Sequence, residues 1–127
     1  MANLNQPPSR VTPNLLHILN AFTDSSNTII NTIVELNSNT INKYELITET
    51  GHLKLDRVGY SSLAYPFAYG CIPRTWDEDG DHWEHYKDLK KPGTCTVNGF
   101  FGIEEAVKVI KDCEERYKKE IDPKLVN

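Results

Sequence analysis

Alternation of apolar and polar positions along the chain predicts short strands followed by one long helix. The clearest pattern lies near the C-terminus, where apolar residues recur at helical spacing between positions 103 and 117. Acidic residues in the first turn and lysines in the last turn complement the helix dipole, and Pro123 ends the pattern. We therefore expect a helix over residues 102–120 whose apolar face consists of Ile103, Ala106, Val107, Ile110, Cys113 and Tyr117.

Two shorter segments near the N-terminus predict one helix and one strand. The pair Thr12-Pro13 is typical of a helix start, and the apolar stripe that follows, from Leu15 to Phe22, predicts a helix of about two or three turns. Residues 28–36 are rich in β-branched side chains, which favour a strand. We expect residues 1–27 to form an N-terminal extension and residues 28–127 to form the main domain.

The central part of the chain predicts further strands. Residues 43–48 and 53–58 form an expected hairpin around a turn at residues 49–51. Residues 60–73 are aromatic and contain proline and glycine, which fits an irregular strand that lines a pocket. A last strand is expected over residues 94–101, so the predicted fold class is α+β.

Composition narrows the class of protein. With 127 residues, 39% of them hydrophobic and 25% charged, the chain has the size and composition of one soluble globular domain. A net charge of -4 argues against a nucleic-acid partner. No apolar run has membrane-spanning length, and the three cysteines lack Cys-x-x-Cys spacing. We expect a cytoplasmic protein with free thiols and no membrane partner.

An acidic loop, residues 77–81, is the first candidate for chemistry. Clustered carboxylates repel one another, so a bound cation makes such a loop easier to tolerate. The alternative is a solvated acidic turn. An EF-hand is excluded, because Gly80 stands at the wrong place in the loop.

Two histidines beside this loop suggest a different metal site. His82 and His85, together with Asp79 and Asp81, could hold zinc or another transition metal. A pair of histidines at this spacing is common by chance, so this remains the weaker alternative.

Cationic residues supply the complement to the acidic loop. Lys43 and Glu45 alternate along one predicted strand and therefore share a face, and Arg57 ends the next strand. Lys87 follows Tyr86 further along the chain. Each of these cations alone is typical of a charged surface residue. Together with nearby carboxylates, however, they are the groups that phosphoryl transfer to water requires. No Gly-x-x-x-x-Gly-Lys phosphate loop is present.

The order of these residues resembles the family I soluble inorganic pyrophosphatases. The resemblance extends from about Thr32 to Lys119 and leaves the N-terminal helix outside it. The segments that carry it are Ile33-Val34-Glu35, Lys43-Tyr44-Glu45, Leu55-Asp56-Arg57, Tyr65-Pro66-Phe67-Ala68-Tyr69-Gly70, Ile72-Pro73, Asp79-Gly80-Asp81, His85-Tyr86-Lys87-Asp88-Leu89 and Val97-Asn98-Gly99-Phe100.

The resemblance implies a fold, a reaction and a set of roles. The family has a small OB-type β-barrel with helices packed on it, hydrolyses inorganic diphosphate with Mg²⁺, and forms homo-oligomers. By this resemblance Asp81 is the base that activates water, and Glu45 supports the same face. Metal binding falls to Glu35, Asp79 and Asp81, and diphosphate binding to Lys43, Arg57, Tyr69, Tyr86 and Lys87.

The chain departs from the family pattern directly after Asp81. The family signature reads Asp-Gly-Asp-Pro-hydrophobic-Asp, whereas here Asp81 is followed by His82-Trp83-Glu84. An internal segment between Asp81 and His82 is therefore missing relative to the family, and Glu84 stands at the spacing of the third carboxylate. A deletion, an engineered shortening and a segment omitted from the sequence all remain open. The expected barrel is accordingly incomplete, and a non-catalytic remnant that binds phosphate compounds or serves as an assembly subunit is the alternative function.

Overall fold

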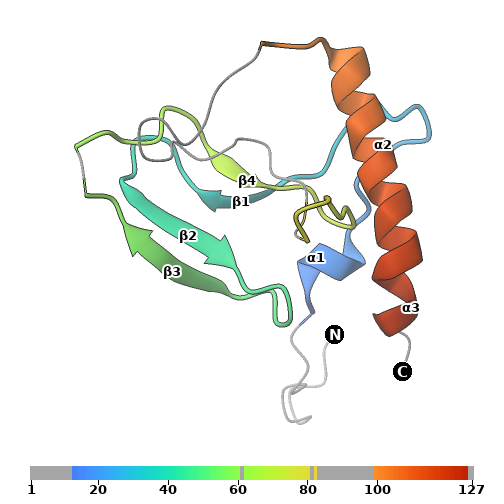
Figure 1. Cartoon of the computed structure of the whole chain (residues 1–127), viewed down its shortest axis with the longest axis horizontal. Helices are drawn as coiled ribbons and strands as arrows, with labels where there is room; N and C mark the ends of the chain where they lie inside the picture. Colours follow the sequence, from blue (N-terminus) through green and yellow to red (C-terminus); the bar gives the residue numbers. More distant parts are fainter. Residues whose placement is uncertain (1–12, 61, 81, 83–98, 126–127) are drawn as a thin grey trace, which may run out of the picture.

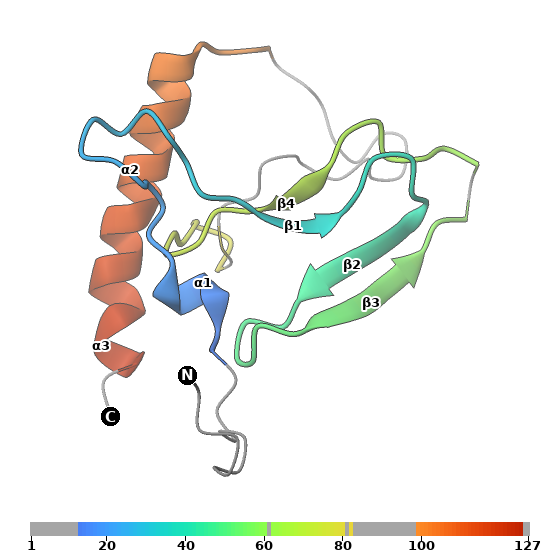
Figure 2. The ribbon, with the colours of Figure 1, turned by 180° about the vertical axis from the view of Figure 1, so that it is seen from behind.

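A computed structural model describes residues 13–60, 62–80, 82 and 99–125 of the chain. Four strands lie together on one side of the molecule, and the long helix stands on the other side (Figure 1). Figure 2 shows the same arrangement from behind, with α1 between the strands and the helix. The elements in chain order are α1 (Leu15–Ile18), β1 (Ile33–Leu36), β2 (Asn42–Leu46), β3 (Leu53–Val58), β4 (Tyr69–Cys71), α2 (Ile103–Glu120) and α3 (Asp122–Leu125).

The described strands form two small antiparallel sheets. β1 pairs with β4, and β2 pairs with β3. The predicted α+β class is confirmed. These four strands do not close into a barrel, because a barrel requires every strand to have two paired neighbours and each described sheet has only two strands. The incomplete OB-type barrel stays a prediction.

The hairpin of β2 and β3 confirms the expected central hairpin. Its turn closes through backbone bonds from Ile47 N–H to the His52 carbonyl at 2.8 Å and from Gly51 N–H to the Ile47 carbonyl at 2.7 Å. Gly51 has a φ of 70°, a conformation that glycine adopts without a steric penalty. The hairpin therefore forms where turn residues separate two alternating segments.

The strand expected over residues 28–36 is shorter in the structure and begins only at Ile33. Asp24 explains the difference, because its Oδ1 accepts hydrogen bonds from the backbone N–H groups of Thr28 at 3.1 Å and Ile29 at 3.0 Å. These bonds hold the chain in a loop. Local side-chain bonds of this kind compete with strand pairing.

The first helix is likewise shorter than expected, a single turn over Leu15–Ile18. Its N-cap is Asn14, two residues after Thr12, the N-cap expected from the sequence. The Asn14 side chain accepts a hydrogen bond from Leu16 N–H at 3.1 Å and donates one to the Thr48 carbonyl at 2.8 Å. Leu19 is already extended, with ψ at 140°, so the helix ends there.

The long helix α2 matches its predicted range and covers the core with only part of its apolar face. Ile110, Cys113 and Tyr117 are buried, whereas Ile103 and Ala106 near its start are exposed. A buried cluster joins the helix to the N-terminal part of the chain and consists of Ala21, Phe22, Ile72 and Ile110. The division of the chain at residue 27 stays a prediction.

Two remaining expectations concern residues at the edge of the described part. Of the strand predicted for residues 94–101, residues 94–98 lie outside the described residues, and Gly99, Phe100 and Phe101 are not in a strand. The segment of residues 62–73 is irregular, as expected, with β4 as its only strand among the described residues. No helix in the described part of the chain is long and apolar enough to cross a membrane.

Candidate active site

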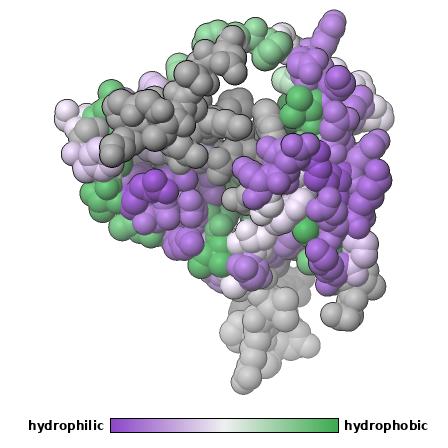
Figure 3. Space-filling model, viewed as in Figure 1, coloured by the Kyte–Doolittle hydropathy of each residue, from purple (hydrophilic) through white to green (hydrophobic). Residues whose placement is uncertain are grey.

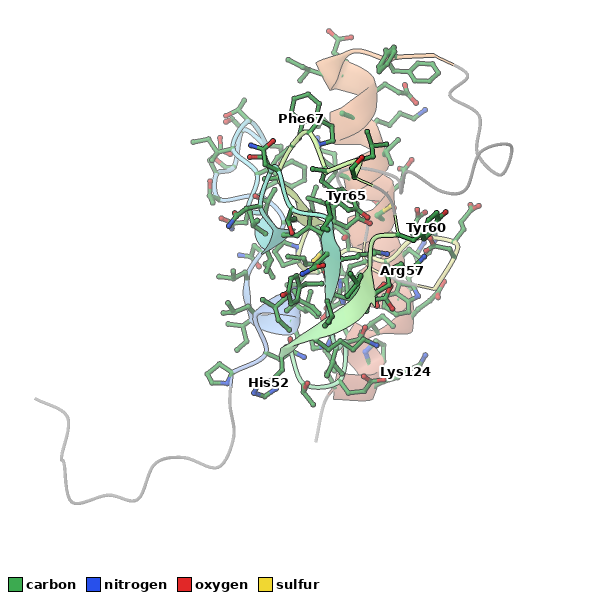
Figure 4. All side chains as sticks on the ribbon, turned by 90° about the vertical axis from the view of Figure 1, so that its left-hand side faces the viewer. His52, Arg57, Tyr60, Tyr65, Phe67 and Lys124 are labelled. Atoms are coloured by element: carbon green, nitrogen blue, oxygen red, sulfur yellow. The ribbon has the colours of Figure 1, made fainter. Side chains whose placement is uncertain are left out.

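A β-bulge in the hairpin brings two predicted cations onto one face. In the register of β2 and β3, Lys43 lies opposite Arg57 and Tyr44 lies opposite Leu55, which leaves Asp56 as an extra residue. An extra residue in one strand re-aims the side chains that follow it. Arg57 therefore shares the face of Lys43 and Glu45. Arg57 is exposed and lies on the side of the molecule that Figure 4 turns toward the viewer.

Residues of both strands make up this surface, which we name the charged face: Lys43, Glu45, Lys54, Asp56 and Arg57. It holds three cationic and two anionic side chains and therefore carries a net positive charge within an acidic protein. A local positive charge of this kind attracts anionic ligands.

Lys43 is the buried member of the charged face, with only 5% of its surface exposed. Its Nζ lies 3.0 Å from Glu45 Oε1 and 5.9 Å from the centroid of the Tyr69 ring. Glu45 also faces Lys54, whose Nζ is 3.8 Å from Oε2. A buried ammonium needs a partner to remain charged, and Glu45 together with the face of Tyr69 provides it.

Tyr69 reaches this position from β4. It is buried, and its ring lies 5.9 Å from the ring of Tyr65, which Figure 4 labels near the sheets. β4 approaches β1 closely, because Gly70 has no side chain between the two strands: an added Cβ would lie 2.0 Å from the Ile33 carbonyl oxygen. The glycine next to Tyr69 thus permits the strand pairing that holds the tyrosine in place.

Asp56 is a member of the charged face for which we predicted no role. The hydrogen bond from Arg57 Nε to Asp56 Oδ2, at 2.7 Å, is the main reason why the pKa of Asp56 is lowered. Burial opposes this effect, and the charges of Arg57 and Lys43 add to it. Asp56 therefore stays ionised at neutral pH and orients Arg57. In the sequence, the only indication of this role is the position of Asp56 beside Arg57 in the Leu55-Asp56-Arg57 segment.

Glu35, a predicted metal ligand, lies on β1 next to the hairpin. Its Oε1 accepts a hydrogen bond from the backbone N–H of Leu46 at 2.7 Å, which ties β1 to β2. A cavity of about 270 Å³ opens beside it, lined by Glu35, Leu36, Asn37, Thr40, Tyr44 and Leu53. Glu35 therefore links β1 to β2 through its hydrogen bond and also lines a cavity.

The acidic loop lies against α2. Arg116 of that helix approaches Asp77 at 3.7 Å and Glu78 at 3.4 Å, and its Nη1 donates a hydrogen bond to the Trp76 carbonyl at 3.0 Å. Asp79 is exposed on the same loop. Arg116 therefore offsets part of the repulsion between these carboxylates. The sequence pattern did not predict this ion pairing.

His82, which the zinc hypothesis requires, is packed among aromatic rings. Only 3% of it is exposed, and its ring centroid lies 5.5 Å from that of Trp76, 5.8 Å from that of His17 and 6.2 Å from that of Tyr117. Burial, followed by the charge of His17, lowers the pKa of His82 to about 4. His82 is therefore neutral at neutral pH and belongs to the packing beneath α2.

Tyr117 completes this aromatic cluster from α2. Its hydroxyl oxygen lies 2.6 Å from His17 Nδ1 in a hydrogen bond, and its ring is contacted by Arg74, which pairs with Asp122 at 3.0 Å. Burial raises the pKa of Tyr117 to about 12, so its hydroxyl stays protonated. The cluster joins α1, the acidic loop and α2.

The structure brings together some of the predicted site residues. Lys43, Arg57 and Tyr69 gather at the charged face with Glu35 on the adjacent strand, whereas Asp79 is on the loop held by α2. Among the described residues, no group of three or more His, Cys, Asp or Glu side chains is placed to hold a metal ion. Asp81, Glu84, His85, Tyr86 and Lys87 lie outside the described residues.

Parts of this chain are similar to known proteins. Residues 32–83 match the family model described as inorganic pyrophosphatase. A soluble inorganic pyrophosphatase of Hordeum vulgare is 51% identical over 64 residues, which are 50% of this chain and 30% of that protein. An inorganic pyrophosphatase of Sulfolobus acidocaldarius is 49% identical over 53 residues, 42% of this chain and 31% of that protein. The chain thus spans less than a third of the curated relatives it matches.

Two solved structures are similar in fold. The inorganic pyrophosphatase from Neisseria gonorrhoeae has a TM-score of 0.71 and 26% identity, covering 82% of this chain and 99% of that chain. The inorganic pyrophosphatase from Thermus thermophilus has a TM-score of 0.51 and 36% identity, covering 57% of this chain and 40% of that chain. The segment that matches the family model, residues 32–83, includes β1 to β4 and therefore the charged face.

Proposed function

We propose that the chain hydrolyses inorganic diphosphate to two orthophosphates, because residues 32–83 match the inorganic pyrophosphatase family model. The observation that carries the proposal is the charged face, where Lys43 and Arg57 lie opposite each other on paired strands beside Tyr69. Cationic side chains bind phosphate oxygens through charge-assisted hydrogen bonds. We propose that Tyr86 and Lys87 complete this binding set.

The proposed reaction adds water across a phosphoanhydride bond. Asp81 accepts a proton from the attacking water, the oxygen of that water bonds to one phosphorus, and the second phosphate leaves. In this proposal Arg57 holds the phosphate oxygens, which its exposure and its ion pair with Asp56 support. Lys43 adds positive charge that is screened only weakly because it is buried.

The proposed cofactor is Mg²⁺. The donor chemistry fits, because the carboxylates of Glu35, Asp79 and Asp81 are the hard oxygen ligands that this ion prefers. When bound, the ion neutralises charge on the phosphates. The proposed setting is the cytoplasm, and the proposed assembly is a homo-oligomer.

The second candidate function is diphosphate binding without hydrolysis. It is favoured by one observation: the described residues assemble the cationic half of a site, while no group of three metal-ligating side chains gathers among them. Metal-assisted hydrolysis needs ions held in a defined position. Binding and hydrolysis must therefore be measured separately.

Phosphate release from diphosphate tests the proposed activity. We expect the wild-type chain to release phosphate with Mg²⁺ and not with a chelator. Asp79→Asn should raise the Mg²⁺ concentration needed for half-maximal rate about tenfold or more, by analogy with the loss of other metal-site contacts. Asp112→Asn, an exposed change on α2, is the control and should leave that concentration unchanged. A wild-type rate equal to that of buffer would leave only the binding function.

A further inference from the structure

We propose that β3 pairs edge to edge with β3 of a second copy of this chain, in antiparallel register centred on Leu55. The outer edge of β3 carries the observations. β3 pairs with β2 and with no other strand among the described residues, and five of its six residues are exposed. In Figure 1 it forms the outer border of the strand layer. An exposed strand edge is a template for pairing with another strand.

One face of this edge is apolar. Leu55 lies opposite Tyr44, and Leu53 lies opposite Leu46, so these four side chains share the face turned away from the charged face. Leu53, Leu55 and Val58 are 54%, 50% and 60% exposed. In Figure 3 hydrophobic side chains border the hydrophilic surface on the strand side of the molecule. Placing Leu55 opposite its own copy removes part of this apolar surface from water.

Charge selects the register of the pair. Lys54 and Asp56 flank Leu55 symmetrically and carry opposite charges. In an antiparallel pair centred on Leu55, Lys54 of each copy lies opposite Asp56 of the other, which gives two attractive cross-strand pairs. The bulge at Asp56 limits this pairing to residues 54–56, because Leu53 and Arg57 lie on opposite faces of β3. A shift by two residues places Lys54 opposite Lys54 or Asp56 opposite Asp56. A shift by one residue sets the apolar face of one strand against the charged face of the other.

Charge also selects the partner. A lysine in the middle of an edge strand opposes pairing with most strands, because its charge would lie opposite an apolar or a cationic side chain. A second β3 places Asp56 at that position. Asp56 is bound to Arg57 within its own chain, so pairing extends this ion pair into a network of both copies. The edge thus discriminates in favour of its own copy.

The exposed apolar start of α2, with Phe100, Phe101 and Ile103, is the other surface through which two copies could meet. No complementary charge pattern identifies what would cover it. We therefore propose no interface at this surface and use it as a control in the experiment.

Sedimentation velocity over a wide range of protein concentration tests the pairing. The wild type should change from monomer to dimer as its concentration rises. Lys54→Asp and Asp56→Lys each replace the two attractive pairs by repulsive ones and should each weaken dimerisation about tenfold or more. The two variants mixed together should form a heterodimer, because every cross-strand pair is then of opposite charge. The double variant Lys54→Asp/Asp56→Lys should dimerise as the wild type does.

The controls separate this interface from loss of fold and from the other surface. Far-ultraviolet circular dichroism should be the same for all variants. Phe101→Lys should leave dimerisation unchanged. A monomeric wild type, single charge variants that dimerise normally, or loss of the dimer with Phe101→Lys would each overturn the proposal. These outcomes are independent of whether diphosphate is hydrolysed.

Discussion

Replacement of Gly70 by alanine is expected to destabilise the protein by about 3 kcal/mol or more. The added methyl group would lie 2.0 Å from the carbonyl oxygen of Ile33 and 2.9 Å from Cα of Val34. Both contacts are with the backbone of β1, which cannot rotate away as a flexible side chain would. β1 and β4 must therefore separate, and Tyr69 loses the strand pairing that positions it beside Lys43.

The measurement is the free energy of unfolding from urea denaturation. Gly102→Ala is the matched control, because nothing lies within 4 Å of a Cβ added there and its φ of -81° suits any residue. Since Gly102 is the N-cap of α2, its change should cost no more than about 1 kcal/mol. Equal stability of Gly70→Ala and the wild type would show that β1 and β4 do not approach as described.

The second large effect expected is a loss of stability between pH 6.5 and about pH 4 that His82 causes. Burial first, and the charge of His17 second, lower the pKa of His82 from 6.5 to about 4. In this interval the unfolded chain binds a proton at His82 and the folded chain does not, so stability is complete above pH 6.5 and falls as pH falls. The loss amounts to about 3 kcal/mol, at 1.36 kcal/mol for each pKa unit.

Urea denaturation at several pH values in the presence of a chelator measures this loss. His82→Phe removes the titrating group while keeping a ring in the cluster, and its stability should depend less on pH across the interval. His52→Phe, an exposed change in the hairpin turn, should keep the wild-type dependence. Asp24 and Asp56, whose pKa values lie below 3.8, affect stability only at lower pH. The same slope in wild type and His82→Phe would contradict the assignment.

Local sequence patterns predicted the elements that depend on local interactions. The hairpin alternates apolar and polar residues on both sides of a glycine turn, and the long helix repeats apolar residues over residues 103–117 with matching charges at its ends. Both are found within a residue or two of the expected positions. Their patterns are long enough to outweigh competing conformations.

Features that depend on distant contacts could not be predicted in this way. The Asn14 side chain donates a hydrogen bond to the carbonyl of Thr48, 34 residues away. Arg116 holds the acidic loop from α2. No residue spacing in the sequence predicts these bonds, because each joins residues that are far apart along the chain.

The candidate site was predictable in part. Alternation along a strand placed Lys43 and Glu45 on one face, but the bulge that brings Arg57 to the same face depends on pairing register. The role of Asp56 follows from that bulge. Asp79 was expected beside the cations by resemblance, and the structure shows the loop around it paired with Arg116.

Calorimetric titration of diphosphate into the metal-free protein tests the central claim, that the charged face binds this anion. The wild type should bind with saturable heat. Arg57→Met, which removes an exposed cation without opening the core, should bind about tenfold to a hundredfold more weakly, as expected for a lost charge-assisted hydrogen bond. Lys108→Met, on the exposed surface of α2, should bind as the wild type does. Equal affinities of Arg57→Met and the wild type, or no binding by the wild type, would contradict the claim.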